Sequence, residues 1–257
     1  MIIDSFIFYN EFDMLEYRLN VLYEHIDYFI IVESSKTFVG NNKILYFNDN
    51  KDRYSNYLDK IIHIIVDDMP ETDNPWIREY HQRNCIDRGI QQLSLKDNDL
   101  IIISDVDEIP NINTIKSITN MDSLISLEQD NYYYNLNYRF DAIKICASKC
   151  MYYNIYVNKY NRLPQNIRNT YINIIKNGGW HLSCFGDEFF IQNKLLNFSH
   201  QEFNNDEYIN IDKIKERMLN GIDIVTRKNI ISEFIKISDN KNLPPKHELL
   251  LKWFNAV

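Results

Sequence analysis

The chain has 257 residues and a formal net charge of −8, with charged residues making up 25% of it. This length is enough for one large domain with a substantial core that does not depend on disulfide bonds. The acidic balance argues against a nucleic-acid partner, because affinity for nucleic acid needs clustered Lys and Arg against the phosphates.

The cysteines and the apolar segments indicate the cellular compartment of the protein. Its four cysteines include no Cys-x-x-Cys pair, so we expect free thiols in a reducing compartment. Met1 leads directly into an apolar strand without a basic stretch, and no apolar run approaches 18 residues. We therefore expect no signal peptide, no membrane span and a soluble, cytoplasmic protein.

The first elements alternate between strand and helix. Residues 2–9 form an apolar run typical of a strand, and Asp13 with Glu16 has the spacing of a capping box at the start of a helix. A second buried strand is predicted over residues 28–32. Strand, helix and strand in this order predict parallel pairing with a right-handed crossover. The polar stretch 35–60 is predicted to be a loop or an extra hairpin.

A second strand-helix unit precedes the most informative stretch. Residues 61–66 predict a strand, and Asn74 with Pro75 opens a helix that extends to about residue 93. Its buried face is expected to contain Trp76, Tyr80, Ile86, Ile90 and Leu93. This helix leads to a run of aliphatic residues, 100–103, that is typical of a strand covered on both faces.

The pattern changes after Pro110. Strands are predicted over residues 123–127, 131–138, 151–157 and 170–175, and a turn at Gly178 to His181. Helices are predicted over residues 187–197, 207–220 and 248–254. We therefore expect an α/β fold with a mixed central sheet.

Acidic residues gather where the aliphatic strand ends. Asp105, Asp107 and Glu108 follow it directly, at the edge where open α/β sheets bind ligands. Carboxylates so close together repel one another unless a cation lies between them. We predict Mn²⁺ or Mg²⁺ at Asp105 and Asp107, together with a phosphorylated substrate. The alternative is a solvated acidic turn, and Glu108 is expected to point inward and support the turn.

Other polar residues are candidates for the same site. His181 and His200 are candidate metal ligands, although a packed, hydrogen-bonded histidine is an equal alternative for each. Asp187 and Glu188 are the leading candidates for a general base, with helix capping or solvent exposure as their alternative. The Arg83-Asn84 pair, in the helix before the acidic strand, is a candidate for contacting a diphosphate or a base.

Four segments together resemble glycosyltransferase family 17. They are residues 10–18, 31–34, 105–110 and 179–183. The resemblance implies a GT-A-type (Rossmann-like) nucleotide-sugar-binding fold, a UDP-N-acetylglucosamine donor, a metal at Asp105 and Asp107, and inversion at the anomeric carbon. It also favours His181 over His200 as the metal ligand.

The resemblance extends to the substrate. It implies that Glu33 faces the nucleoside and that Arg83 and Asn84 match a pair found ahead of the metal strand. The matching segments also contain Asn10, Glu11 and Trp180, which we expect to contact substrate. The chain is then a single domain with a nucleotide-binding half (1–110), an acceptor-side half (111–225) and a C-terminal helical tail (226–257).

These observations predict a metal-dependent inverting glycosyltransferase. It would move N-acetylglucosamine from a UDP-sugar to a hydroxyl of a glycan or glycoconjugate acceptor, with a carboxylate taking the hydroxyl proton. One alternative is a phosphohydrolase of the haloacid-dehalogenase type, which also places an Asp-x-Asp after an apolar strand, but Ile109 departs from its motif. Another is a catalytically inactive sugar-binding domain.

Overall fold

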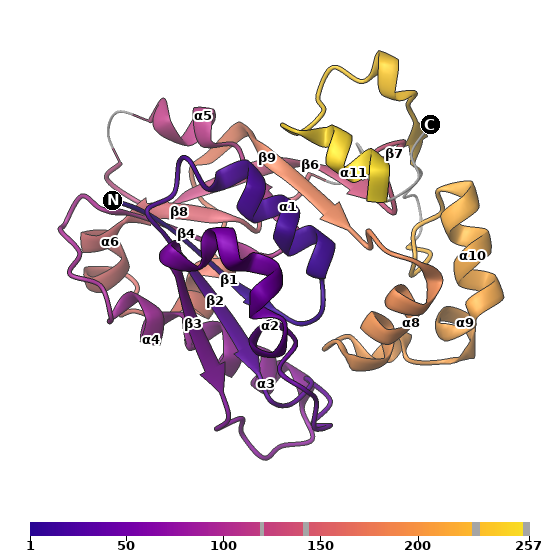
Figure 1. Ribbon diagram of the computed structural model, residues 1–257, viewed down its shortest axis with the longest axis horizontal. Coiled ribbons are helices and arrows are strands. Elements are labelled where there is room, and N and C mark those ends of the chain that lie inside the picture. Colours follow the sequence, from indigo (N-terminus) through magenta and orange to yellow (C-terminus); the bar gives the residue numbers. More distant parts are fainter. Residues whose placement is uncertain (119–120, 141–143, 228–231, 254–257) are drawn as a thin grey trace.

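A computed structural model describes residues 1–118, 121–140, 144–227 and 232–253. It confirms an α/β fold around a mixed central sheet (Figure 1). Along the sheet the described strands lie in the order β10-β7-β6-β8-β4-β1-β2-β3, and β9 pairs with β5 and β6.

Four neighbouring parallel strands of the sheet are the ones predicted in the first half. They are β1 (Ile2–Phe8), β2 (Tyr28–Ser34), β3 (Ile61–Val66) and β4 (Leu100–Asp105). β1 pairs in parallel with both β2 and β4, and β2 pairs with β3. The chain therefore crosses from β1 to β2 in one direction and from β3 to β4 in the other. Right-handed crossovers in opposite directions place their helices on opposite faces, which creates a switch point between β1 and β4.

The helix after β1 begins two residues earlier than predicted and without the expected capping box. α1 covers Phe12–Leu22, and its N-cap residue is Glu11, which makes no side-chain cap hydrogen bond. The capping-box prediction is wrong because Asp13 lies inside the first turn of α1 and is not its N-cap residue. Arg53 instead binds both members of the predicted box: Nε lies 2.9 Å from Glu16 Oε2, and Nη2 donates to Asp13.

Residues 35–60 are neither a plain loop nor a hairpin. They contain α2 (Tyr46–Asp49) and a 3₁₀ helix over Lys51–Lys60, preceded by an isolated bridge between Lys36 and Asn42. Phe47 and Tyr54 anchor this segment: both are fully buried, and their rings stack with centroids 5.4 Å apart.

The single helix predicted after residue 74 is two helices. α3 (Pro75–Asn84) has the expected N-cap, in which Asn74 Oδ1 accepts a hydrogen bond from Trp76 N at 3.0 Å. α3 ends at Asn84, and after Cys85, which keeps right-handed helical dihedral angles, the chain continues as α4 (Ile86–Ile90). The predicted buried face is confirmed for Ile86 and Ile90 of α4, but it is wrong for Tyr80 of α3.

The buried residues of α3 are Arg78, Gln82 and Arg83, whereas Tyr80 is exposed. These polar side chains are buried because they find partners: Gln82 Nε2, for example, donates to the Val32 carbonyl at 2.9 Å.

Two short elements follow β4. They are β5 (Glu108–Pro110) and α5 (Ile112–Lys116). The strands predicted over 123–127 and 131–138 form one strand, β6 (Ile125–Tyr133), followed by the short β7 (Tyr138–Arg139). The strand predicted over 151–157 is instead β8 (Lys149–Tyr152), antiparallel to β4, followed by α6 (Tyr153–Asn158) and later by α7 (Pro164–Arg168).

The predicted Gly-Gly turn lies inside a long strand. β9 covers Ile174–Ser183, antiparallel to β5 and parallel to β6. Gly179 has φ +143°, and a Cβ there would lie 2.1 Å from the Ile109 carbonyl oxygen. These glycines therefore permit close strand pairing rather than a reversal of the chain.

The remaining elements cover the carboxyl edge of the sheet and α1. They are α8 (Glu188–Asn197), a 3₁₀ turn (Gln201–Phe203), α9 (Asp206–Ile209), α10 (Ile211–Asn220), β10 (Glu233–Phe234), a 3₁₀ turn (Ile237–Asp239) and α11 (His247–Trp253). The tail is thus not purely helical, since β10 pairs with β7. Residue 254, the predicted end of the last helix, lies outside the described residues.

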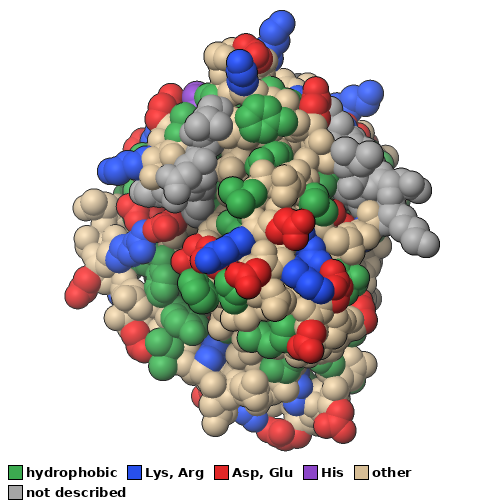
Figure 2. Space-filling model, turned by 90° about the vertical axis from the view of Figure 1, so that its right-hand side faces the viewer, with side chains coloured by type: hydrophobic (Ala, Val, Ile, Leu, Met, Phe, Trp, Pro, Cys, Tyr) green, Lys and Arg blue, Asp and Glu red, His purple; other side chains and the backbone are tan. Residues whose placement is uncertain are grey.

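The surface carries charges of both signs (Figure 2), and the cysteines are free thiols, as expected from the sequence. Acidic and basic side chains lie interspersed among apolar groups on the face shown in Figure 2. All four cysteines are free. Among the described helices, none has the length and apolarity needed to cross a bilayer.

Candidate functional site

A cavity of about 210 Å³ opens at the carboxyl ends of β1 and β4. Its lining comes from the end of β1 with Tyr9 and Glu11 after it, from the loop after β2, from α3, from the turn after β4, and from His181 and α8. This is the switch point of the sheet, where open α/β proteins bind ligands. Asp105 and Asp107 both line it, as the sequence predicted.

Two arginines hold the carboxylate of Asp105. Arg83 Nη2 lies 3.0 Å from Oδ1, and Arg168 Nη2 lies 2.6 Å from Oδ2. Burial by itself raises the pKa of Asp105, but the charges of Arg168 and Arg83 outweigh it and bring the pKa well below its usual value. Asp105 is therefore ionised, and both of its oxygens accept charge-assisted hydrogen bonds.

Asp107 faces a different set of partners. Its exposed fraction is 8%, Lys194 Nζ lies 3.3 Å from Oδ2, and His181 Nε2 lies 3.8 Å from Oδ1. Burial by itself lowers the pKa of Lys194, but the negative charges of Asp107 and Glu11 outweigh burial and raise the pKa of Lys194 above its usual value. The two aspartates thus line one cavity, but their carboxylates contact different side chains.

Asn131 of β6 orients His181. Its Oδ1 lies 2.9 Å from His181 Nδ1; a ring proton on Nδ1 would satisfy this contact and leave the lone pair of Nε2 facing Asp107. Two acceptors that face each other in this way suit a shared cation. Nothing in the local sequence around Asn131 indicated this role.

Glu108 points inward, as expected. It is 1% exposed, its Oε2 accepts from the Asp105 amide at 3.0 Å, and Arg168 donates to both of its oxygens. Glu108 therefore supports the acidic turn.

A second buried group holds the same turn. Arg18 of α1 is fully buried; Nη1 donates to the carbonyls of Asp105, Val106 and Glu108 at 2.8, 3.2 and 2.9 Å, and Nε donates to Asp4 at 2.8 Å. Arg18 lies in the family-like segment 10–18, but no local pattern indicates its role, because the turn that it contacts lies about 90 residues away.

Glu11 brings a further carboxylate into the cavity. Oε2 accepts from the amides of Tyr9 and Asn10, both at 3.0 Å. Burial raises the pKa of Glu11; Lys194 opposes this effect and Asp107 adds to it. Asn10 itself is not among the described residues that line the cavity.

Three predicted substrate contacts lie elsewhere. Glu33 is fully buried beneath α2, where it accepts from the amides of Phe47 and Asn48 at 2.9 and 3.2 Å. The side chain of Asn84 accepts from the Gln165 amide, and Trp180 donates its indole proton to the Asn242 carbonyl.

The predicted bases and the second histidine are also outside the cavity lining, as far as the structure describes it. Asp187 caps α8 by accepting from Phe190 N at 2.8 Å, and Glu188 pairs with Lys215 at 3.1 Å. His200 packs against Trp76 and pairs with Glu202 at 2.7 Å.

These features define an α/β protein with a ligand cavity at the switch point of its sheet, lined by acidic and basic side chains. The chain belongs to glycosyltransferase family 17, whose family model matches residues 1–246.

Among curated proteins, the chain is similar to the beta-1,4-mannosyl-glycoprotein 4-beta-N-acetylglucosaminyltransferases of Homo sapiens and Rattus norvegicus. It is 29% identical to each over 107 residues. The match covers 39% of this chain and only 20% of each relative. Among solved structures, the inositol-1-phosphate CTP transferase from T. maritima has a TM-score of 0.35 at 11% identity, over 84% of this chain and 96% of its own. That likeness is too weak to support an argument about the fold.

Proposed function

We propose that this chain transfers N-acetylglucosamine from a UDP-sugar to a hydroxyl of a glycan or glycoconjugate, with inversion at the anomeric carbon, on a GT-A-type fold. Membership of family 17 and the printed activity of the relatives support the sugar transfer. The observation that carries the proposal is the cavity at the switch point, in which Asp107 and His181 lie beside Lys194 and Arg83. Cationic side chains there suit a diphosphate.

The residues present fit a divalent cation. Asp107 and His181 would hold it, since Nε2 of His181 faces Asp107 and a ring proton on Nδ1 would be accepted by Asn131. Mn²⁺ or Mg²⁺ bound there would neutralise negative charge on the departing diphosphate. Asp105 is assigned a different part: it holds Arg83 at the cavity wall through an ion pair of 3.0 Å.

The structure favours Glu11 as the general base over Asp187 and Glu188. Glu11 lines the cavity, and its Oε1 makes no hydrogen bond within the described residues. Burial raises the pKa of Glu11, which makes this carboxylate a stronger base than an exposed glutamate. In the reaction Glu11 takes the hydroxyl proton, the hydroxyl oxygen bonds to the anomeric carbon, and the bond from that carbon to the diphosphate breaks, releasing UDP.

The phosphohydrolase alternative needs a carboxylate of the Asp-x-Asp free to attack phosphorus. The carboxylate of Asp105 is not free in this sense, because each of its oxygens is ion-paired with an arginine.

The test is release of UDP from UDP-N-acetylglucosamine with Mn²⁺ and a panel of glycan acceptors. Asp107→Asn should lower the rate at least about 100-fold and weaken Mn²⁺ binding measured by calorimetry, while the melting temperature stays close to that of the wild type. Glu188→Gln is the matched control and should keep full activity, since Glu188 pairs with Lys215 outside the cavity. Undiminished transfer by Asp107→Asn would remove Asp107 from the mechanism, and phosphate release from simple phosphoesters would favour the hydrolase.

A further inference from the structure

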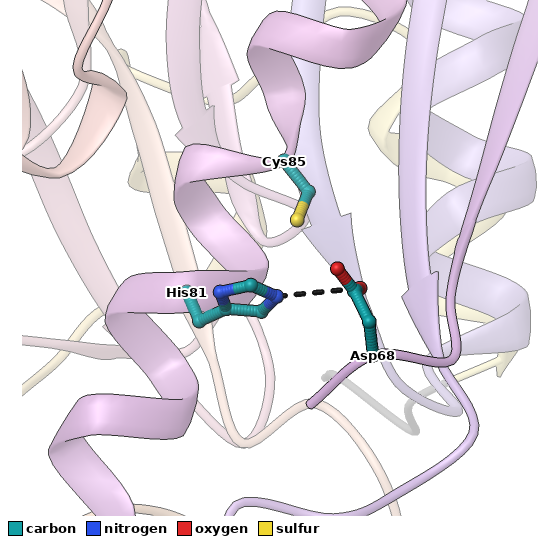
Figure 3. Close-up of side chains that lie close together, drawn as sticks. All are labelled: Asp68, His81 and Cys85. Atoms are coloured by element: carbon teal, nitrogen blue, oxygen red, sulfur yellow. Dashed lines mark hydrogen bonds and ion pairs between the residues drawn. The ribbon is translucent and has the colours of Figure 1, made fainter. Parts of the chain in front are cut away.

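A second group of ligand-type side chains lies on the opposite side of α3 from the cavity. Asp68 follows β3, while His81 and Cys85 are four residues apart and lie on one face of the helix (Figure 3). One atom from each side chain, a carboxylate oxygen, a ring nitrogen and a thiol sulfur, lies within 4.8 Å of the other two. Within the described ranges, no other three His, Cys, Asp or Glu side chains converge so closely.

The spacing within this cluster suits a tetrahedral ion. His81 Nε2 and Asp68 Oδ1 are 3.3 Å apart. Two ligands about 2.0–2.1 Å from a tetrahedral Zn²⁺ are separated by roughly the same distance. Cys85 is 3% exposed and closes the inner side, whereas the side chains of Asp68 and His81 are 52% and 31% exposed. The outer side is therefore open to a water ligand.

We propose that Asp68, His81 and Cys85 form a binding site for Zn²⁺ or a similar transition-metal ion, with water as the fourth ligand. One oxygen, one imidazole nitrogen and one thiolate make a donor set typical of zinc and not of Mg²⁺. The ion would join the loop after β3 to α3, the helix that carries Gln82 and Arg83 to the cavity. Its role is structural and independent of the proposed sugar transfer.

Arg88 fits this arrangement as an outer partner. Its Nη1 and Nη2 donate to Asp68 at 3.0 and 2.6 Å, and carboxylate ligands of metals are commonly held by such hydrogen bonds. Without metal, burial raises the pKa of Cys85 to about 11, so the thiol is protonated at neutral pH. Binding forms a metal–sulfur bond and releases the thiol proton to water.

The test uses the untagged full-length protein and Co²⁺ as a spectroscopic probe. We expect one equivalent of Co²⁺ to give a thiolate-to-metal charge-transfer band in the near ultraviolet, and Zn²⁺ to displace it. Zn²⁺ should also raise the melting temperature. Cys85→Ser should abolish the band and weaken Zn²⁺ binding at least about 100-fold.

Two control variants separate this site from the cavity and from other thiols. Cys146→Ser, at a half-buried thiol in another part of the molecule, and Asp107→Asn, in the cavity, should both keep the band and the affinity. Absence of a thiolate band in the wild-type protein, or a band that survives Cys85→Ser, would overturn the proposal. Neither outcome depends on whether the chain transfers sugar.

Discussion

At the scale of single residues, the acidic turn after β4 depends on a buried cation that the turn itself does not contain. Arg18 is fully buried, pairs with Asp4 and donates to three carbonyls of the turn. Replacing it with an apolar residue would leave the Asp4 carboxylate buried without a charged partner and the turn without its donors. Both effects lower stability.

We expect Arg18→Met to lower the free energy of unfolding by about 3–5 kcal/mol, because it breaks a buried ion pair by removing one member. Urea denaturation followed by circular dichroism measures the change. Arg53→Met is the matched control: it removes a surface cation that pairs with Asp13 and Glu16, and should change stability by no more than about 1 kcal/mol. Equal losses for the two variants would contradict the role of Arg18.

A buried lysine makes stability depend on alkaline pH. Lys149 is fully buried, donates to Ser126 Oγ at 3.1 Å and lies 4.0 Å from the centroid of the Tyr171 ring. Burial, helped by the charge of Arg168, lowers its pKa to about 8. In the unfolded chain its pKa is about 10.4, so between these values the unfolded state binds more protons.

Stability should therefore rise with pH from about 8 to about 10.4 on account of Lys149, by at most about 1.4 kcal/mol per pH unit. Lys149→Met should remove this rise, so the difference in unfolding free energy between wild type and variant changes steadily over that range. Urea denaturation at pH 7, 8, 9 and 10 measures it. Parallel pH profiles for the two proteins would show that Lys149 has an ordinary pKa.

At the scale of elements, comparing the predicted and observed bounds of strands shows where local sequence patterns predict structure well. The strands of the parallel sheet were predicted closely because their burial on both faces leaves near-continuous aliphatic runs. The antiparallel half was predicted less well. The Gly178-Gly179 pair looks like a turn in the sequence, yet it lies within β9 because two neighbouring strands approach it.

α8 gives the element-scale prediction. Asp187 accepts from the Phe190 amide at the start of this helix, so Asp187→Ala should cost about 1 kcal/mol of stability and leave sugar transfer nearly unchanged. Chemical denaturation and UDP release measure the two effects. A loss of activity of 100-fold or more at unchanged stability would instead restore Asp187 as the base.

At the scale of the whole molecule, the last helix ties the two halves together. Leu250 of α11 is 1% exposed and belongs to one apolar cluster with Tyr17 of α1, Ile109 of β5 and Leu182 of β9. Tyr17 also donates its hydroxyl proton to the Pro245 carbonyl at 2.6 Å. The C-terminal segment thus belongs to the core.

Leu250→Ala should lower the free energy of unfolding by about 2–4 kcal/mol, because it leaves a cavity in that cluster. The melting curve should keep a single transition. Leu219→Ala serves as the control: its side chain is 76% exposed, so the change should stay within about 0.5 kcal/mol. A loss confined to a separate early transition would show that the tail unfolds independently.

Local patterns were enough to predict the parallel strands, the acidic turn at the end of β4 and the family, because strand burial and short motifs are local properties of the chain. The packing of distant segments sets which side chains meet in the cavity. Asp107 lies beside His181 and Lys194, whereas Asp105 pairs with Arg83 and Arg168. Glu33 and Asp187 make structural hydrogen bonds outside the cavity. The physical reason is that ion pairs and hydrogen bonds between residues many positions apart depend on how the strands cross and pair, and no local pattern records that arrangement.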